Sequence, residues 1–192
     1  MPRTAKQLVV LKEKKREVIL EAALRVFADH GYAGSNMDEI AKRARISKGL
    51  IYTYFPSKEV LLIEVLRDGL AKIENEFMRI PKANSLKGKE EFSVLVQQWV
   101  EMFTKENDFW RLYSMLLLQK GITTRIEKEL SGSLESYMEI FIPYFRKKGS
   151  SDPVAEAFLF GATLDGVMVD LIVSPRNYPL KRMLKMIIEK FG

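Results

Sequence analysis

Residues 31–58, GYAGSNMDEIAKRARISKGLIYTYFPSK, decide the fold, because they contain two short helical patterns joined by a tight turn. Ser35 followed by Asp38 is a capping-box-like start, and the apolar residues after it recur at helical spacing, which predicts a short helix. Ser47 is positioned to cap a second helix. Two such helices separated by so short a turn predict a helix-turn-helix over about residues 37–56.

The second predicted helix has the features of an element that reads DNA. Its N-terminus carries partial positive charge, Lys48 adds a full charge, and Gly49 removes the side chain that would keep the backbone away from phosphate. Leu50, Ile51 and Phe55 are spaced to turn inward, and in a helix-turn-helix the second helix enters the major groove by its N-terminal residues. The residues that we expect to contact DNA are Ser35, Ser47, Lys48, Gly49, Leu50, Tyr52, Thr53, Tyr54 and Lys58.

Seventeen positions in one register resemble the N-terminal domain of the tetracycline-repressor (TetR) family, and the resemblance covers residues 14–74. The matching residues are Phe27, Gly31, Tyr32, Ile40, Ala41, Ala44, Ser47, Lys48, Gly49, Tyr52, Tyr54, Phe55, Ser57, Lys58, Glu59, Leu61 and Leu62. The resemblance implies a DNA-binding domain at residues 14–74 and a ligand-binding and dimerisation domain at residues 75–192.

Two residues depart from the family pattern. Arg45 occupies the position in the turn where the family has glycine, so either a non-glycine residue adopts a left-handed or strained conformation or the turn differs. Leu50 stands where the family often has a small or hydroxylated residue. The base that this position reads therefore cannot be taken from the family.

The composition is that of a globular protein with a basic N-terminal part. The chain has 192 residues, 47% of them hydrophobic, and it contains no cysteine, which excludes disulfides and thiolate metal sites. Residues 1–60 hold 12 Lys and Arg against 7 Asp and Glu, whereas the remaining residues hold 19 against 18. This asymmetry is typical of a DNA-binding head on a nearly neutral effector domain, although basic surfaces are often merely solvated.

The location that we expect is the cytoplasm, with no contact with a membrane. Leu8 to Leu11 is the only early apolar run, and it is too short for the apolar region of a signal peptide. The longest apolar run, residues 157–173, contains Asp165 and Asp170, each of which costs about 2.5–3.5 kcal/mol near the centre of a helix in lipid. A buried helix is the better interpretation.

Helical periodicity and the absence of strand alternation predict an all-α protein of about nine helices. The helix that starts at Ser57 runs to about Arg79, so it is long enough to span both domains and to couple an effector site to the DNA-binding head. The main expected ranges are about 13–30, 57–79, 109–119, 153–173 and 179–191.

The predicted C-terminal domain has aromatic and methionine side chains on several helical faces. We expect Trp99, Phe103, Trp110, Tyr113, Tyr137, Phe141, Asp165 and Met168 to line a cavity for an apolar or aromatic effector. Each of these residues has an alternative role, because large apolar stripes usually form core and Asp165 can be a structural carboxylate with a satisfied partner.

A seam of small and apolar residues on the helix at 153–173 predicts close approach by another helix. It consists of Ala155, Leu159, Ala162, Gly166 and Val169. With Leu184 and Ile188 of the last helix, this seam predicts a four-helix homodimer interface, as the family resemblance also implies. The alternative is that both helices only close the core of the monomer.

An enzyme is not expected. The single histidine, His30, sits at a helix end beside Gly31, and the sequence lacks a glycine-rich phosphate loop, metal-ligand spacing and a nucleophile elbow. Neither catalytic residues nor a cofactor is therefore predicted. We expect a transcriptional regulator, a repressor that binds a palindromic double-stranded DNA operator as a dimer and is released by a small apolar or amphipathic effector. The alternative is an all-α adaptor or small-molecule-binding protein whose helix-turn-helix is not used on DNA.

Overall fold

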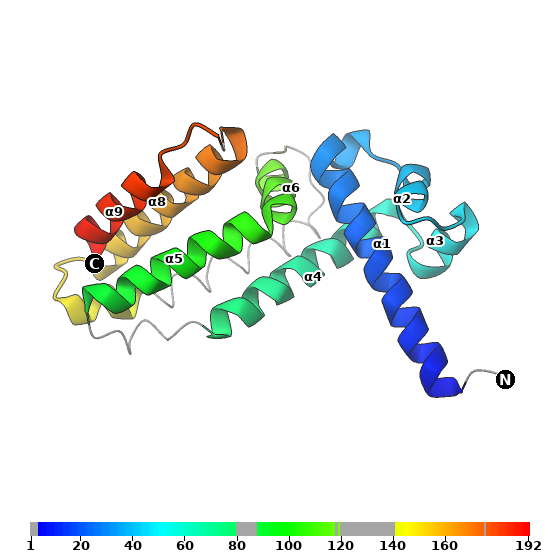
Figure 1. Ribbon diagram of the computed structural model, residues 1–192, viewed down its shortest axis with the longest axis horizontal. Coiled ribbons are helices and arrows are strands. Elements are labelled where there is room, and N and C mark those ends of the chain that lie inside the picture. Colours follow the sequence, from blue (N-terminus) through cyan, green and yellow to red (C-terminus); the bar gives the residue numbers. More distant parts are fainter. Residues whose placement is uncertain (1–3, 80–87, 118, 120–140, 175) are drawn as a thin grey trace. The chain divides into compact units, whose positions relative to one another are not determined.

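The computed structural model describes residues 4–79, 88–117, 119, 141–174 and 176–192, and these residues form helices without any strand. Residues 141–148 are also helical. The helices drawn in Figure 1 are α1 (Ala5–Gly34), α2 (Met37–Arg43), α3 (Lys48–Tyr54), α4 (Lys58–Arg79), α5 (Lys89–Lys105), α6 (Asn107–Leu117), α8 (Pro153–Val173) and α9 (Leu180–Phe191). The predicted all-α class is confirmed.

Contacts between residues divide the chain into two compact units. The first comprises residues 1–70 together with 108–122, and the second comprises residues 71–107 together with 123–192. α4 is continuous across this division, since its residues through Leu70 belong to the first unit and those from Ala71 onward to the second. α6 belongs almost entirely to the first unit, although the chain reaches it only after α5.

α1 begins earlier than the sequence predicted. Thr4 caps it by accepting a hydrogen bond from the backbone N–H of Gln7, and the Gln7 side chain accepts one from the Thr4 backbone, so a full capping box starts the helix at Ala5 rather than near residue 13. Gly31, with φ of 70°, interrupts the helical backbone. A left-handed glycine is the usual way to end a helix, and its position agrees with the predicted end of this helix near residue 30.

The core of the first unit is the apolar face of α1 packed with α2, α3 and the first turns of α4. Ile19, Val26, Phe27, Ile40 and Ile51 are all fully buried. A separate contact ties α6 to α4. A Cβ built on Gly69 of α4 would lie 2.1 Å from two ring carbons of Phe109, so glycine is what allows this ring to pack against the helix.

Aromatic rings form the core of the second unit. The Phe160 ring of α8 contacts Phe92 of α5, Phe141, Phe145 and Phe191 of α9, with centroids 4.8–5.9 Å apart. The Tyr144 hydroxyl donates to the backbone oxygen of Phe191 at 3.3 Å. The end of α9 is therefore fixed in this core by both packing and a hydrogen bond.

Candidate nucleic-acid interface

The connection between α1 and α2 is held by two residues that the sequence assigned to DNA contact. The Ser35 hydroxyl is buried and donates to the backbone oxygen of Tyr32 at 2.8 Å. The Lys58 ammonium donates to the backbone oxygens of Tyr32 and Ser35 at 2.7 and 2.9 Å, and it lies 4.5 Å from the centroid of the Tyr32 ring. Both side chains thus stabilise the end of α1 and the start of α4 in this structure.

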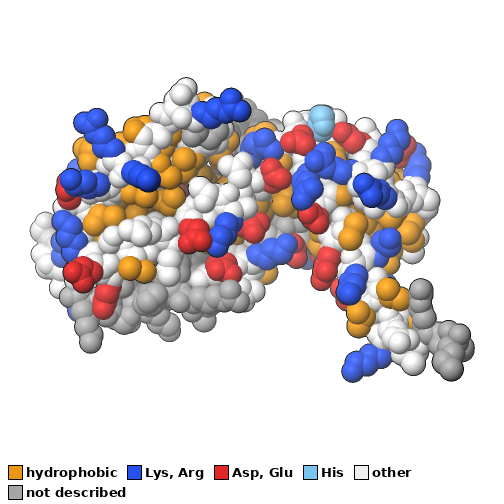
Figure 2. Space-filling model, viewed as in Figure 1, with side chains coloured by type: hydrophobic (Ala, Val, Ile, Leu, Met, Phe, Trp, Pro, Cys, Tyr) orange, Lys and Arg blue, Asp and Glu red, His pale blue; other side chains and the backbone are white. Residues whose placement is uncertain are grey.

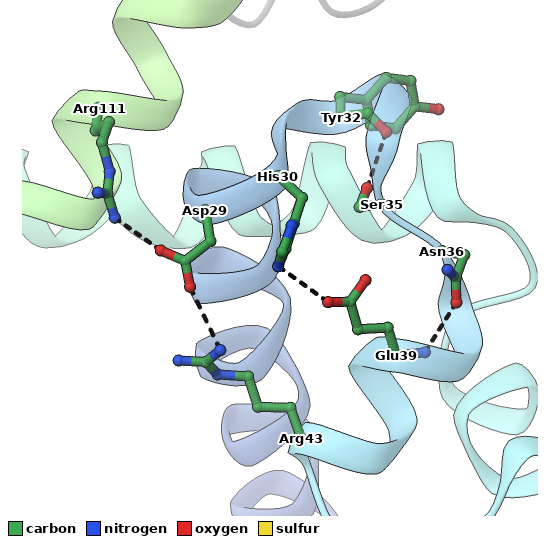
Figure 3. Close-up of polar contacts among 8 residues, drawn as sticks. All are labelled: Asp29, His30, Tyr32, Ser35, Asn36, Glu39, Arg43 and Arg111. Atoms are coloured by element: carbon green, nitrogen blue, oxygen red, sulfur yellow. Dashed lines mark hydrogen bonds and ion pairs between the residues drawn. The ribbon is translucent and has the colours of Figure 1, made fainter.

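The N-cap of α2 is Asn36 rather than Ser35, so the predicted cap was wrong by one residue. The Asn36 side-chain oxygen accepts a hydrogen bond from the Glu39 N–H at 2.9 Å, as Figure 3 shows. Ser35 cannot take this role because its hydroxyl is directed back to Tyr32. The Glu39 carboxylate in turn lies 3.1 Å from His30 Nε2, which joins α2 to the end of α1.

Asp29 near the end of α1 joins two other helices (Figure 3). Its carboxylate lies 3.4 Å from Arg43 of α2 and 3.1 Å from Arg111 of α6, and Arg111 also pairs with Asp108 at 3.0 Å. These side chains are about two-fifths exposed, so each ion pair is worth about 0–1 kcal/mol. Their shared carboxylate links α6 to the end of α1.

The turn between α2 and α3 is a Schellman motif with arginine in the position that favours glycine. Arg45 has φ of 55°, its N–H bonds to the Lys42 oxygen at 3.1 Å, and the Ile46 N–H bonds to the Ala41 oxygen at 3.0 Å. The first of the two alternatives for this departure, a left-handed residue, is therefore confirmed. The left-handed conformation costs a non-glycine residue roughly 1–2 kcal/mol.

α3 presents one face to the core of its unit and the other to solvent. Ser47 caps it, as predicted, by accepting a hydrogen bond from the Leu50 N–H at 3.2 Å. Ile51 and Phe55 are buried, whereas Tyr52 is 43% exposed. The predicted contact residues that lie exposed are Ser47, Lys48, Gly49, Tyr52 and Thr53, and those that lie half-buried are Leu50, Tyr54 and Lys58. The exposed set lies along the first two turns of one short helix.

Sequence reasoning missed the partner of Lys48. Its ammonium lies 2.8 Å from the Asp38 carboxylate of α2, and this hydrogen bond and charge raise the pKa of Lys48 above its usual value. Both side chains are at least half exposed, so the ion pair is weak and easily exchanged for a phosphate. Ten residues separate the partners, and no sequence spacing signals such a pair.

The predicted effector residues fall in both units. Trp99, Phe103, Phe141 and Met168 are buried in the second unit, where the Trp99 and Phe103 rings lie 3.9 Å apart. Trp110 and Tyr113 are buried in the first unit with Phe109. Asp165 lies on an exposed part of α8, and Tyr137 falls outside the described residues. Of the buried residues in this set, four thus belong to the second unit and two to the first.

A groove lies between α4 and α5 in the second unit. It has a volume of about 380 Å³, with buried Ile73 and Met102 in its lining. The other lining residues are polar or charged: Lys72, Asn75, Glu76, Gln98, Glu101, Lys105 and Glu106. Across the described ranges no group of three or more His, Cys, Asp or Glu side chains is suited to hold a metal ion. Within those ranges no helix is both long enough and apolar enough to cross a membrane.

The predicted α8 seam is exposed in the protomer. Ala155, Leu159, Ala162, Gly166 and Val169 all face solvent, while Leu184 and Ile188 of α9 are half-buried. Figure 2 shows hydrophobic side chains gathered over α8 and α9, with Lys and Arg side chains around them. The seam does not close the core of this protomer, which is formed by the opposite face of α8.

Comparison with known sequences finds a family model that matches the part of the chain with the helix-turn-helix. The family model "Bacterial regulatory proteins, tetR family" matches residues 19–65. An uncharacterized HTH-type transcriptional regulator of Bacillus subtilis, YuxN, is 52% identical over 56 residues, which are 29% of this chain and 19% of that protein. The fatty acid metabolism regulator protein of Bacillus subtilis is 23% identical over 186 residues, covering 93% of this chain and 94% of the relative.

Solved structures share the fold along nearly the whole chain. The regulator FadR from Bacillus subtilis in complex with stearoyl-CoA has a TM-score of 0.70 and 21% identity, and the match covers 91% of this chain and 96% of FadR. AibR in complex with isovaleryl coenzyme A and operator DNA has a TM-score of 0.72 and 19% identity, covering 92% of this chain and 97% of AibR. The proteins similar to this chain are regulators rather than enzymes.

The Lys48–Asp38 pair leads to two opposite expectations for DNA binding. We expect Lys48→Ala to weaken binding to every duplex and to lower the slope of log affinity against log salt by about one unit per head, because one phosphate contact is lost. Asp38→Asn should strengthen binding, since it frees the ammonium and removes a negative charge beside it. Fluorescence anisotropy titrations at several salt concentrations measure both. Equal affinities and slopes for all three proteins would exclude Lys48 from the interface.

Proposed function

We propose that this chain, which belongs to the tetR family of bacterial regulatory proteins, is a cytoplasmic repressor that binds a palindromic operator as a dimer and is released by an acyl-type effector. The main support for the proposal is that α3 has one buried face and one exposed face. Its inward residues fix the helix in the first unit, while Lys48, Gly49 and Tyr52 are exposed together.

The charge of the chain favours DNA as the partner of this exposed face. The first 60 residues carry the excess of positive charge, and neutralisation of phosphate supplies most of the non-specific affinity of DNA-binding proteins. An adaptor that did not use its helix-turn-helix on DNA would need no such excess. AibR, which shares the fold, has been solved in complex with operator DNA, and this supports the same interpretation.

Binding to the DNA upstream of the chain's own coding sequence tests the proposed function. We expect specific binding that is at least a hundredfold tighter than binding to a shuffled duplex of equal length, with an affinity that falls steeply as salt rises. Reporter expression from the same DNA should rise when the chain is deleted. Equal affinity for the specific and shuffled duplexes at every salt concentration would favour the adaptor.

The exposed face of α8 supports a homodimer. Phe158, Leu159 and Val173 are 52%, 53% and 76% exposed in the protomer, and small residues between them leave room for a facing helix. Asp165 lies on this side of α8, where partial burial raises the pKa of its carboxyl. A carboxylate on an apolar interface requires a polar partner, so Asp165 is better suited to an interface contact than to an effector cavity.

Substitution at Gly166 tests the dimer without disturbing the protomer. A Cβ at this position meets nothing within 4 Å, so the protomer has room for a larger side chain. We expect Gly166→Leu to be a folded monomer at micromolar concentration, since extra methylenes overfill a close-packed interface. Gly166→Ala, as the matched smaller change, should stay largely dimeric. Multi-angle light scattering measures the masses, and a monomeric wild-type protein would overturn the dimer.

Trp99, in the second unit, has an indole N–H group that can donate a hydrogen bond to an effector. Its indole Nε1–H is buried and has no hydrogen-bond partner in the part of the chain that the structure describes. Buried donors are nearly always paired, so a ligand carbonyl is a suitable acceptor. An acyl thioester has such a carbonyl beside an apolar chain, and the solved structure of FadR with stearoyl-CoA supports this ligand class. The Phe103 ring beside Trp99 matches the apolar part.

Two substitutions of Trp99 separate its ring from its N–H group. We expect Trp99→Phe to weaken binding of long-chain acyl-CoA by about fivefold to tenfold, in line with the loss of one hydrogen bond of about 1 kcal/mol or slightly more. Trp99→Ala should weaken it further, because it also removes apolar contact. Isothermal titration calorimetry measures ligand affinity, and operator binding without ligand serves as the control. If acyl-CoA binds both variants as tightly as wild type, Trp99 is not part of the effector site.

A further inference from the structure

We propose that Arg45, in the turn between α2 and α3, binds a DNA phosphate outside the reading helix α3. The inference rests on the proposed DNA-binding function and adds a contact to it. The backbone of this turn is strained at Arg45. Arg45 has φ of 55° in a Schellman turn, where glycine adopts the same backbone without strain. A residue that raises the energy of the turn indicates a gain elsewhere.

The described part of the protomer shows no such gain. Arg45 is exposed, and its guanidinium makes neither an ion pair nor a hydrogen bond to any described residue. The other arginines described in this unit all pair with a carboxylate: Arg16 with Glu64, Arg25 with Glu21, Arg43 with Asp29, Arg67 with Glu64 and Arg111 with Asp29 and Asp108. Arg45 is therefore the exception among the described arginines of this unit, and its guanidinium group is available to an external anion.

The position of the turn identifies that anion. In a helix-turn-helix the first helix crosses the DNA backbone and the second lies in the major groove, so the turn between them passes the edge of the groove, where phosphates lie. Arg45 lies two residues before the α3 cap, Ser47. Guanidinium groups bind phosphate oxygens with two parallel hydrogen bonds. The free energy of such a contact offsets the strain of the left-handed backbone, and it does so only in the complex with DNA. The contact carries no base information and so acts on any sequence.

Variants at this position separate the backbone effect from the side-chain effect. Arg45→Gly should raise the melting temperature by about 2–4 °C, because the left-handed strain is removed, and yet weaken DNA binding. Arg45→Ala should lose the same binding without the gain in stability. Both variants should bind DNA about tenfold more weakly at low salt. For each DNA-binding unit, the slope of log affinity against log salt concentration should fall by about one, on specific and shuffled duplexes alike. Arg45→Lys, which keeps the charge but not the fork, should lie between wild type and alanine.

Arg25→Ala is the matched control for net charge. Arg25 lies exposed on α1 and pairs with Glu21 one turn away, so its removal changes the total charge equally without touching the turn. We expect its salt slope to equal that of wild type. If wild type binds DNA while Arg45→Ala binds with unchanged affinity and slope, Arg45 contacts no phosphate and the inference is overturned. If wild type itself binds no duplex, the proposed DNA-binding function fails together with it.

Discussion

The reading helix depends on the burial of two side chains. α3 has seven residues, and isolated helices shorter than about 12–15 residues are marginal in water, so packing rather than propensity must fix it. Ile51 and Phe55, four residues apart, supply the buried contacts. The Arg16 guanidinium lies 5.9 Å from the centroid of the Phe55 ring and pairs with Glu64 of α4. The exposed residues between these anchors can therefore meet DNA in only one orientation.

The TetR resemblance combines residues of the fold with residues of the interface. Sequence alone assigned Ser35 and Lys58 the same role as Lys48, and that role stays a prediction. In the structure Lys58 also donates to two backbone oxygens and Ser35 is buried, whereas Lys48 is exposed. A sequence motif shows which residues occur together, but it does not show which atoms each side chain contacts. Polar residues at the ends of helices are especially ambiguous, since the groups that cap a helix are chemically suited to bind phosphate as well.

Local signals predicted the elements well. The cap at Ser47 and the start of α4 at Ser57 depend on residues within one turn, and the structure confirms both. Long-range and competing interactions were beyond such signals. The pair between Asp29 and Arg111 joins residues 82 positions apart. The cap of α2 depends on whether Ser35 or Asn36 faces the helix, and the buried bond from Ser35 to Tyr32 decides it.

Any coupling of an effector to DNA must pass through elements that both units share, and α4 is continuous between them. A hundredfold change in operator affinity requires about 2.7 kcal/mol of difference in effector affinity between two states. At about 25 cal/mol per Å², burial that differs by roughly 100 Å² suffices. Gly69, one residue before the last α4 residue of the first unit, is the point at which α4 admits the Phe109 ring of α6. Glycine has a low helix propensity, so in the proposed response to an effector α4 would yield most readily at this contact with α6.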